Sequence, residues 1–468
     1  MKKIIAISLV AVSALTGCQG FLTEEPILSQ SNELTLSTIE GVDKATAGAY
    51  APLGSTSWYG NEFVIMNEMK TANGKKWIGS DWDSGRCLSY YNINFNENST
   101  SSLWSAAYYV ISAANNVLAN VEGKGTEADV NNLKAEALFL RALAHFDLVR
   151  TFAMPYNHTA DASHLGVPVI VEPQAPSATP ARAKVSEVYT QIISDLTTAE
   201  TLIAADYVRG FKDPKASVTK EAIQALLSRA YLYTENWQKA ADYAATVINS
   251  KKFTLWTAAE LKDAACYTVD VPTGGEVIFE IYGDKLNSYD GYHDGLTPMT
   301  GPTGYGDAGC SADLIGLYEA TDVRSTLFQE EGGCTWTAKY KGKGNGKPDQ
   351  NNVIVLRLSE MYLNLAEAVA NGANGHNGVA ALEAIATSRG ATAQPCTKEG
   401  VYAERNKELA WEAHLWFDLA RTGRDMTRVD FIGAEDARTV EAGSYKWAMP
   451  IPMRETGVNP NLVQNEGY

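Results

Sequence analysis

Residues 219–250 read TKEAIQALLSRAYLYTENWQKAADYAATVINS, and this stretch predicts two helices joined by a tight turn. Apolar residues recur at steps of three and four over 219–234 and again over 237–250, which is the spacing of one helix face. Small side chains at Ser228 and Ala240 allow the two helices to approach closely. The segment therefore predicts an antiparallel helical hairpin.

Six side chains of this hairpin lie at the positions where a tetratricopeptide repeat has large, small, aromatic, small, bulky and small residues in turn. They are Leu227, Ser228, Tyr231, Ala240, Ala244 and Val247. Ala244 and Val247 fit the pattern only loosely. One repeat cannot bury its own apolar face, so neighbouring helix pairs must stack on it. Helical periodicity elsewhere supplies them, over 39–50, 103–121, 129–152, 186–204, 356–370, 378–388 and 401–422. Because these helices come from distant parts of the chain, we expect one co-folded, mainly α scaffold.

Two long regions interrupt the helical pattern. Residues 54–102 are rich in Gly, Asn, Ser and Asp with scattered aromatic residues, and long loops in compact proteins are usually functional. Residues 255–350 have a similar composition with short β-like runs such as 276–281. We therefore expect a tetratricopeptide-like helical scaffold over 37–254 and 351–468, with a ligand-loop insertion near 54–102. An irregular, loop-rich subdomain with minor β-structure is expected over 255–350.

The start of the chain predicts a lipid-anchored protein. Two lysines precede a short apolar run over 4–15, which cannot span a bilayer because a spanning helix needs about 20 residues. The pattern predicts a secretory signal peptide over 1–17. The ending LTGC, residues 15–18, has the form of a bacterial lipobox, in which the cysteine thiol carries lipid. We expect lipidation at Cys18 and a tether over 18–36; the alternative is an ordinary signal peptide with an incidental cysteine.

Charge and cysteine spacing exclude several classes of function. The 468-residue chain has a net charge of −16, whereas nucleic-acid binding needs a basic surface. None of the 6 cysteines forms a CxxC pair, so a structural zinc site is not expected. In an oxidising location, Cys310 and Cys334 are the pair that we expect to form a disulfide. No metal ion and no cofactor is expected.

Motifs of enzymes are not found in the sequence. It has no Gly-x-Ser-x-Gly, no phosphate-binding loop, no dinucleotide-binding glycine pattern and no His-Glu-x-x-His. Carboxylates on predicted helices are spaced three residues from arginines, which favours structural ion pairs over catalysis: Arg357 with Glu360, Arg405 with Glu408, and Asp418 with Arg421. Glu136 and Arg141, within an apolar helix, fit the same interpretation. The sequence therefore predicts a protein that is not an enzyme.

Aromatic residues of the two irregular regions predict a ligand platform. A sugar ring has a flat apolar face and a hydroxylated rim, so Trp or Tyr can stack on the face while polar groups bind the rim. The candidate ligand-binding residues are Trp77, Trp82, Tyr90, Tyr289, Tyr292 and Trp336. The alternative is that most of these rings anchor the irregular regions onto the helices.

An ordered set of short motifs along the chain is similar to the SusD/RagB family of nutrient-binding lipoproteins from Bacteroidota. It includes Cys18-x-x-Phe21-Leu22 with Pro26, then Trp104, Tyr108 and Asn115-Asn116, Glu136-Ala137 with Arg141-Ala142, Arg357-Leu358-x-Glu360, Glu404-Arg405-x-x-Glu408-Leu409, Pro450-Ile451-Pro452 and Gln464-Asn465-x-Gly467-Tyr468. The sequence departs from the family pattern after Glu412, where Ala413-His414 replaces the usual Gly and Arg, and at Ser388-Arg389-Gly390-Ala391.

This resemblance implies a non-catalytic protein of the cell surface, anchored by lipid in the outer membrane. Such proteins bind an oligosaccharide, or in some relatives a peptide, and pass it to a SusC-like TonB-dependent outer-membrane barrel. Two alternatives remain open, a secreted glycan-degrading enzyme and a protein-binding scaffold or adhesin. The identity of the glycan or peptide does not follow from the sequence.

Overall fold

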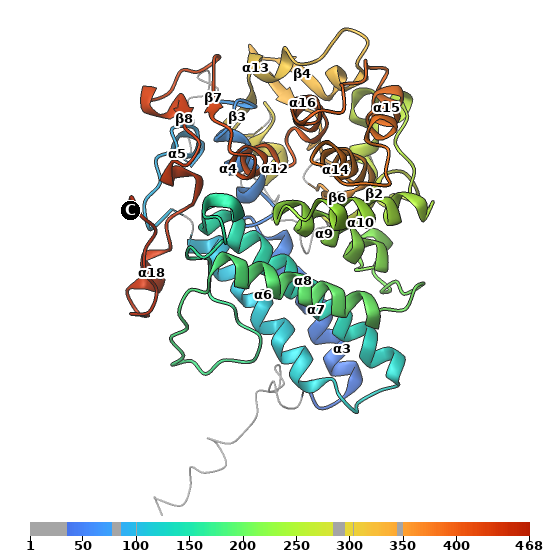
Figure 1. The fold of residues 1–468 in the computed structure, drawn as a ribbon, viewed down its shortest axis with the longest axis vertical. Coiled ribbons are helices and arrows are strands. Elements are labelled where there is room, and N and C mark those ends of the chain that lie inside the picture. The colour runs from blue at the N-terminus through green and yellow to red at the C-terminus, as the bar shows by residue number, and fades with distance from the viewer. Residues whose placement is uncertain (1–34, 77–85, 100, 284–294, 303, 344–349) are drawn as a thin grey trace, which may run out of the picture.

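The computed structural model describes residues 35–76, 86–99, 101–283, 295–302, 304–343 and 350–468, and they form a mainly α protein (Figure 1). Its long helices are α3 (Ile39–Gly48), α6 (Ser101–Asn120), α7 (Glu127–Phe152), α8 (Val185–Leu202), α9 (Lys220–Tyr233), α10 (Trp237–Asn249), α14 (Leu358–Ala370), α15 (Gly378–Arg389) and α16 (Lys398–Leu409). Helices α6, α7, α8, α9, α10 and α14 contact one another in that order. The predicted mainly α, tetratricopeptide-like scaffold is confirmed.

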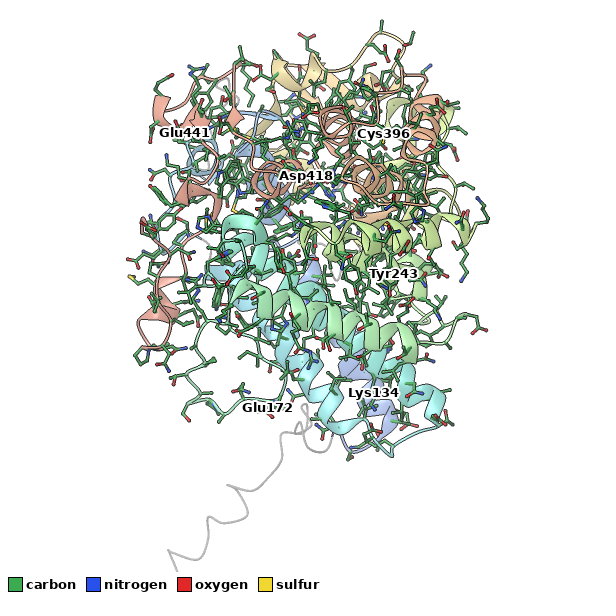
Figure 2. All side chains as sticks on the ribbon, in the orientation of Figure 1. Lys134, Glu172, Tyr243, Cys396, Asp418 and Glu441 are labelled. Carbon is green, nitrogen blue, oxygen red and sulfur yellow. The ribbon has the colours of Figure 1, made fainter. Side chains whose placement is uncertain are left out.

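The hairpin of α9 and α10 packs as its small residues predict. Ser228 is buried, and its Oγ donates a hydrogen bond of 3.0 Å to the backbone oxygen of Ala240 on the facing helix. The Tyr231 ring stacks on Tyr243 with 5.7 Å between ring centroids; Figure 2 labels Tyr243 on α10. Helix α14, from the other end of the chain, packs on α10. Distant segments therefore complete the array, as expected.

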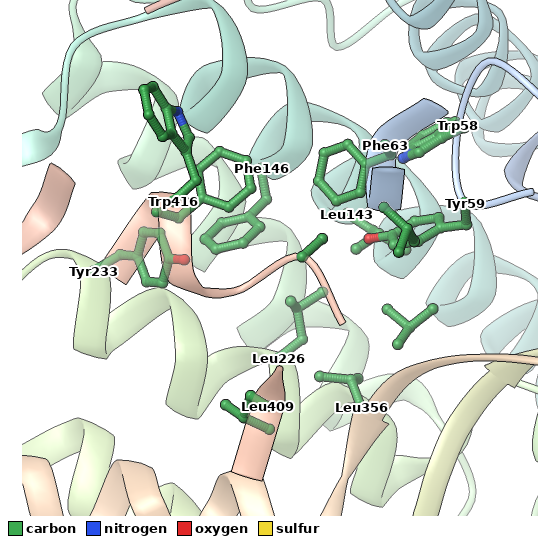
Figure 3. Close-up of a cluster of buried hydrophobic side chains, with 14 of the residues drawn as sticks. Trp58, Tyr59, Phe63, Leu143, Phe146, Leu226, Tyr233, Leu356, Leu409 and Trp416 are labelled. Carbon is green, nitrogen blue, oxygen red and sulfur yellow. The ribbon is translucent and has the colours of Figure 1, made fainter. Parts of the chain in front are cut away.

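Helix α7 forms the centre of the helical scaffold. Every residue from Ala135 to Phe152 is buried, because α6 covers one side of the helix and α8 another. A capping box at Thr126 and Asp129 fixes where α7 begins. Figure 3 shows how the core beside it combines side chains from distant parts of the chain, including Trp58, Leu226 and Leu409.

Short strands join the irregular regions to the scaffold. One antiparallel sheet has the order β1 (Gly74–Lys76), β3 (Ala308–Cys310), β5 (Cys334–Thr337) and β4 (Phe328–Glu331). A second pairs β2 (Val277–Ile281) with β6 (Val353–Arg357), which leads directly into α14. A third pairs β7 (Met426–Thr427) with β8 (Thr439–Val440). The β-like run predicted at 276–281 is confirmed as β2.

Two predictions of secondary structure are wrong in part. The helix expected over 401–422 is interrupted, because α16 ends at Leu409 and α17 covers Leu415–Arg421. Between them Trp411 and Ala413 have φ of 63° and 60°, a left-handed conformation that cannot continue a helix. The stretch 54–102, expected to be irregular, contains α4 (Glu62–Met69) and α5 (Arg86–Tyr91). Phe63 to Met69 of α4 are all buried, so the sequence of this helix has no polar face to reveal it.

The predicted disulfide is also wrong, because Cys310 and Cys334 are free thiols. They lie on neighbouring strands, where Cys310 is directly opposite Thr335. Successive residues of a strand point to opposite faces of the sheet, so Cys334 points away from Cys310. A Cβ atom added to Gly309 would lie 2.4 Å from the Cys334 Sγ, which places that sulfur on the Gly309 face. The strand register therefore separates the two thiols.

Candidate ligand-binding site

A polar cavity of about 300 Å³ lies where the region 54–102 meets the short helix α12 (Leu296–Met299) of the irregular subdomain. We call it the loop cavity. It is lined by Thr56, Ser57, Asn61, Glu62, Tyr90, Asn98, Ser99, Ser102 and Met299. Both regions that the sequence predicts to carry ligand-binding residues therefore contribute to one cavity.

The lining of the loop cavity consists mostly of neutral hydrogen-bonding groups. Four hydroxyl groups and two carboxamides come from serine, threonine and asparagine, and Tyr90 adds an aromatic ring. Glu62 is the one carboxyl group among the described lining residues. Hydroxyls and amides both donate and accept hydrogen bonds, so they can match the rim of a sugar. The cavity therefore suits a neutral ligand with many hydroxyl groups.

A tight turn positions the wall formed by residues 56–62. The Glu62 N–H donates to the backbone oxygen of Thr56 at 2.8 Å, and the Gly60 N–H donates to that of Ser55 at 3.0 Å. A Cβ atom on Gly60 would lie 2.4 Å from the backbone oxygen of Gly54, so only glycine fits there. The turn leads directly into α4, which is held in the core.

The Tyr90 ring is supported from behind by a stack of buried rings. It lies against Phe95, with 6.0 Å between ring centroids. The Lys70 ammonium is 5.9 Å from the Phe95 centroid and 4.2 Å from that of Trp416, a cation–π arrangement. Burial holds the pKa of Lys70 well below its usual value. Tyr90 is therefore positioned by the core, and it is 7% exposed.

The six ligand-binding residues predicted from the sequence do not lie together in one site among the described residues. Tyr90 lines the loop cavity, whereas Trp336 is buried on β5 and donates its indole N–H to the backbone oxygen of Glu331 at 3.1 Å. In this conformation the Trp336 ring packs in the interior, so a role in ligand binding stays a prediction. Trp77, Trp82, Tyr289, Tyr292 and Cys18 lie outside the described residues.

Sequence reasoning missed most of the polar lining. The prediction was based on aromatic rings. Single serines, threonines and asparagines in a loop have no sequence pattern that identifies them as ligand-binding residues. Asn92, which lies next to the predicted rings in sequence, accepts a hydrogen bond of 2.8 Å from the Ala434 backbone and so holds another loop. Asn98, six residues further on, lines the cavity instead. Only the tertiary contacts distinguish these two amides.

Several other buried carboxylates form ion pairs within the scaffold. Glu408 accepts hydrogen bonds from three arginines at 2.7 to 3.1 Å: Arg324, Arg357 and Arg389. Glu136 pairs with Arg209 at 2.8 Å, and Arg141 pairs with Asp195 at 2.6 Å. These groups are almost fully buried and satisfied by one another. Their contacts confirm the predicted structural role, although most partners differ from the predicted ones.

The described residues contain neither a membrane-spanning helix nor a metal-binding cluster. No described helix is both long enough and apolar enough to cross a bilayer. Within the same ranges, no three side chains of His, Cys, Asp or Glu gather closely enough to hold a metal ion.

Two family models match the chain. One, described as "Starch-binding associating with outer membrane", matches residues 20–232, and the model of the SusD family matches residues 334–468. "SusD-like protein P2" of Formosa agariphila is 26% identical over 100% of both chains. A "SusD-like protein" of Bacteroides ovatus is 25% identical over 70% of this chain and 65% of its own length.

Solved structures give the same result. A SusD superfamily protein of Bacteroides thetaiotaomicron has a TM-score of 0.82 and 28% identity, with 92% of this chain and 99% of that chain covered. One of Bacteroides vulgatus has a TM-score of 0.82 and 29% identity at the same coverage. A laminarin-binding SusD-like protein, 24% identical with a TM-score of 0.76, shares the fold over 92% of this chain and 100% of its own. The chain belongs to the SusD/RagB family.

Proposed function

We propose that the protein is a non-catalytic lipoprotein of the cell surface that binds a neutral oligosaccharide in the loop cavity. It delivers the oligosaccharide to a SusC-like TonB-dependent barrel in the outer membrane. The observation that carries this proposal is the loop cavity itself, because neutral hydroxyl and amide groups from both predicted ligand regions line it beside the Tyr90 ring.

The charge of the protein favours an uncharged glycan. The net charge of −16 repels polyanionic chains, and the loop cavity has Glu62 and no basic side chain among its described lining residues. A neutral glycan meets no such repulsion. The starch-binding description of the matching family model supports the same class of ligand.

The proposed anchoring rests on the sequence LTGC at residues 15–18 and on the outer-membrane association in the family description. Acyl chains attached at Cys18 hold the protein at the membrane, since each buried methylene contributes about 0.8 kcal/mol. The proposed tether over 18–36 connects this anchor to the scaffold.

Calorimetric titration with starch-derived and laminarin-derived oligosaccharides tests the binding site. Asn98→Ala removes one exposed amide from the cavity wall, and we expect binding to weaken by about threefold to tenfold, as for the loss of one neutral hydrogen bond. Asn116→Ala is the matched control, because Asn116 bonds locally to the Ser112 backbone about 20 Å along α6 from Ser102. If both variants weakened binding equally, or if Asn98→Ala left the affinity unchanged, the ligand would bind outside the loop cavity.

Analysis of the oligosaccharide after long incubation separates binding from catalysis. Glycoside hydrolysis ordinarily uses a pair of carboxyl groups, and the described lining of the loop cavity supplies Glu62 alone. We expect the distribution of chain lengths to stay unchanged by mass spectrometry. New reducing ends that disappear in Glu62→Gln would instead identify an enzyme.

A further inference from the structure

An open groove of about 450 Å³ lies between helix α6, the segment 168–180 and the C-terminal tail, which begins with α18 (Met453–Thr456). Figure 1 shows α18 beside the loop that follows α7. We call this space the tail groove. Its apolar lining includes Trp104, Tyr108, Ile111, Ile170, Val458 and Leu462. It shares no described lining residue with the loop cavity, so it is a separate space.

One face of α6 forms the floor of the tail groove. Trp104, Tyr108 and Ile111 are three or four residues apart, so they lie on the same side of the helix. The Trp104 and Tyr108 rings pack on each other with 4.9 Å between centroids. The lining residues extend from Trp104 to Ser112, which is about 12 Å along the helix axis. About four residues of an extended chain have the same length.

The segment that forms the opposite wall is fixed at both ends. At one end, the Asn115 amide donates to two backbone oxygens of the segment, at 3.1 and 3.2 Å. At the other end, the Asn459 amide donates to the Pro180 backbone oxygen at 2.8 Å. Both asparagines are buried, whereas residues 171–179 are exposed; Figure 2 labels Glu172 among them. Buried side chains therefore hold an exposed rim over the groove.

This rim offers backbone groups for pairing with a second chain. Three of its residues, Gln174, Ala175 and Ser177, line the groove. Among the described residues, their backbone N–H groups donate to no acceptor. An extended peptide can use such unpaired groups for main-chain hydrogen bonds, while its side chains contact the apolar floor. The tail groove therefore has the features of a peptide-binding surface.

Glu455 gives the tail groove a negative charge, and it is the one charged side chain among the described lining residues. Glu455 is half-buried, and its carboxylate has no hydrogen bond or ion pair with another described residue. Burial raises the pKa of Glu455, against the charge of the neighbouring Arg454. A partly desolvated carboxylate in an apolar groove is stabilised by a cation that joins it there.

Charge distinguishes between the possible occupants of the groove. The chain's own segment 18–36 contains no lysine or arginine and carries Glu24 and Glu25, which Glu455 repels. A second copy of the chain has a net charge of −16, which disfavours association of two copies. A segment of another protein that contains a basic residue meets neither repulsion.

From these features we infer that the tail groove binds an extended segment of another protein, in which one lysine or arginine lies between apolar residues. The basic side chain pairs with the Glu455 carboxylate and can approach the Tyr108 ring, as cations do with aromatic faces. The apolar residues on either side cover Val458 and Met453, which are 76% and 46% exposed. The inference concerns a surface separate from the proposed glycan site.

Fluorescence anisotropy with two sets of synthetic seven-residue peptides tests this inference. Both sets have leucine, valine and proline at the outer positions, and the central residue is lysine in one set and glutamate in the other. We expect the wild-type protein to bind the lysine set about tenfold more tightly, as for one hydrogen bond to a charged group. Glu455→Lys should reverse this preference, because the variant places a cation where the wild-type protein has a carboxylate.

Ser112→Trp obstructs the groove from α6 without changing Glu455, and it should weaken binding of the lysine set about tenfold. Ser194→Trp is the matched control, because Ser194 is also an exposed helical serine but does not line the groove. Thermal melting checks that the variants fold. No binding of either set, equal binding of both sets by the wild-type protein, or an unchanged preference in Glu455→Lys would overturn the inference. Oligosaccharide binding should be the same in Glu455→Lys and the wild-type protein, which separates this test from that of the proposed function.

Discussion

Glu68 is a buried carboxyl group that joins helix α4 to the turn between α16 and α17. Its Oε1 accepts the backbone N–H of Ala413 at 2.8 Å, and its Oε2 accepts the Asn73 amide at 2.9 Å. Burial raises the pKa of Glu68 to about 7, although these hydrogen bonds favour the charged form. Between about pH 5 and about pH 7 the folded chain therefore holds a proton that the unfolded chain has released.

We predict that Glu68→Gln reduces the dependence of stability on pH. A carboxyl whose folded pKa is raised stabilises most at low pH, so its contribution falls as pH rises from about 4.5 to about 7, by up to about 3 kcal/mol. Glutamine does not titrate, and Asn73 Oδ1, which has no hydrogen-bond partner among the described residues, can accept its new N–H. Denaturant unfolding at about pH 5 and about pH 8 should show a smaller difference between the two pH values in the variant. An equal difference in both proteins would contradict this role of Glu68.

For single residues, the sequence predicts which kinds of side chain can bind a ligand better than it predicts where those side chains lie in the fold. Tyr90 could be predicted as a candidate because aromatic rings can stack on the face of a sugar, and it does line the loop cavity. The hydroxyls beside it were not recognisable, because serine and threonine are common in every loop. Trp336, from the other irregular region, was predicted on the same grounds but packs in the interior. Local sequence does not tell which face of a short strand the scaffold will cover.

At the scale of elements, the α9–α10 hairpin depends on the close approach of two helices. Ala240 is 0% exposed and lies at the contact with Ser228. We predict that Ala240→Leu destabilises the protein by about 1–3 kcal/mol, because the larger side chain must separate the helices. Thr246→Leu is the control on the same helix, where the side chain is exposed. Thermal melting should show a clear loss for the first variant and little change for the second; similar values for both would contradict the packing account.

Ion pairs between elements could be predicted only in part. Asp418 and Arg421 do pair within one helix, at 2.6 Å; Figure 2 labels Asp418 among the packed helices. Glu360 instead pairs with Arg229 of α9 at 2.6 Å, although its spacing from Arg357 favoured a local pair. Spacing identifies residues that can meet along one helix. In a stacked array, the neighbouring helix offers a second set of partners, which only the tertiary fold defines.

We predict that Glu408→Gln destabilises the protein strongly. Glu408 is 3% exposed and binds arginines from three separate elements. Its neutralisation removes one of the carboxylates that balance these buried positive charges, at a cost of about 3–5 kcal/mol. Glu435→Gln is the matched control, because Glu435 pairs with Arg438 on the surface and should matter little. A small effect of Glu408→Gln on the denaturation midpoint would mean that Glu276 and Glu412 suffice to compensate the arginines.

For the whole molecule, the order of helices and the mainly α class followed from the sequence, because amphipathic periodicity extends over whole helices. The break between α16 and α17 did not follow, since it depends on Trp411 and Ala413 adopting positive φ against a remote carboxyl group. The loop cavity could be anticipated as a region but not as a shape. It forms only when residues from 56–102 and Met299 meet on the scaffold.

The proposed lipid anchor leads to a prediction about the complete chain. Mass spectrometry of protein from native cells should find an amino terminus that begins at Cys18 and carries acyl chains. Cys18→Ser should abolish the modification and release the protein from the membrane fraction, because a single polar side chain cannot retain it there. An unmodified amino terminus on wild-type protein would contradict anchoring through this cysteine.

The most direct test of the central claim is a crystal structure of the protein with the oligosaccharide that binds it best. We predict an intact glycan in the loop cavity, with a sugar ring against Tyr90 and hydroxyl groups within hydrogen-bonding distance of Asn98 and Ser102. A glycan bound on the outer faces of the helices with the loop cavity empty, or a cleaved glycan in the cavity, would contradict the account.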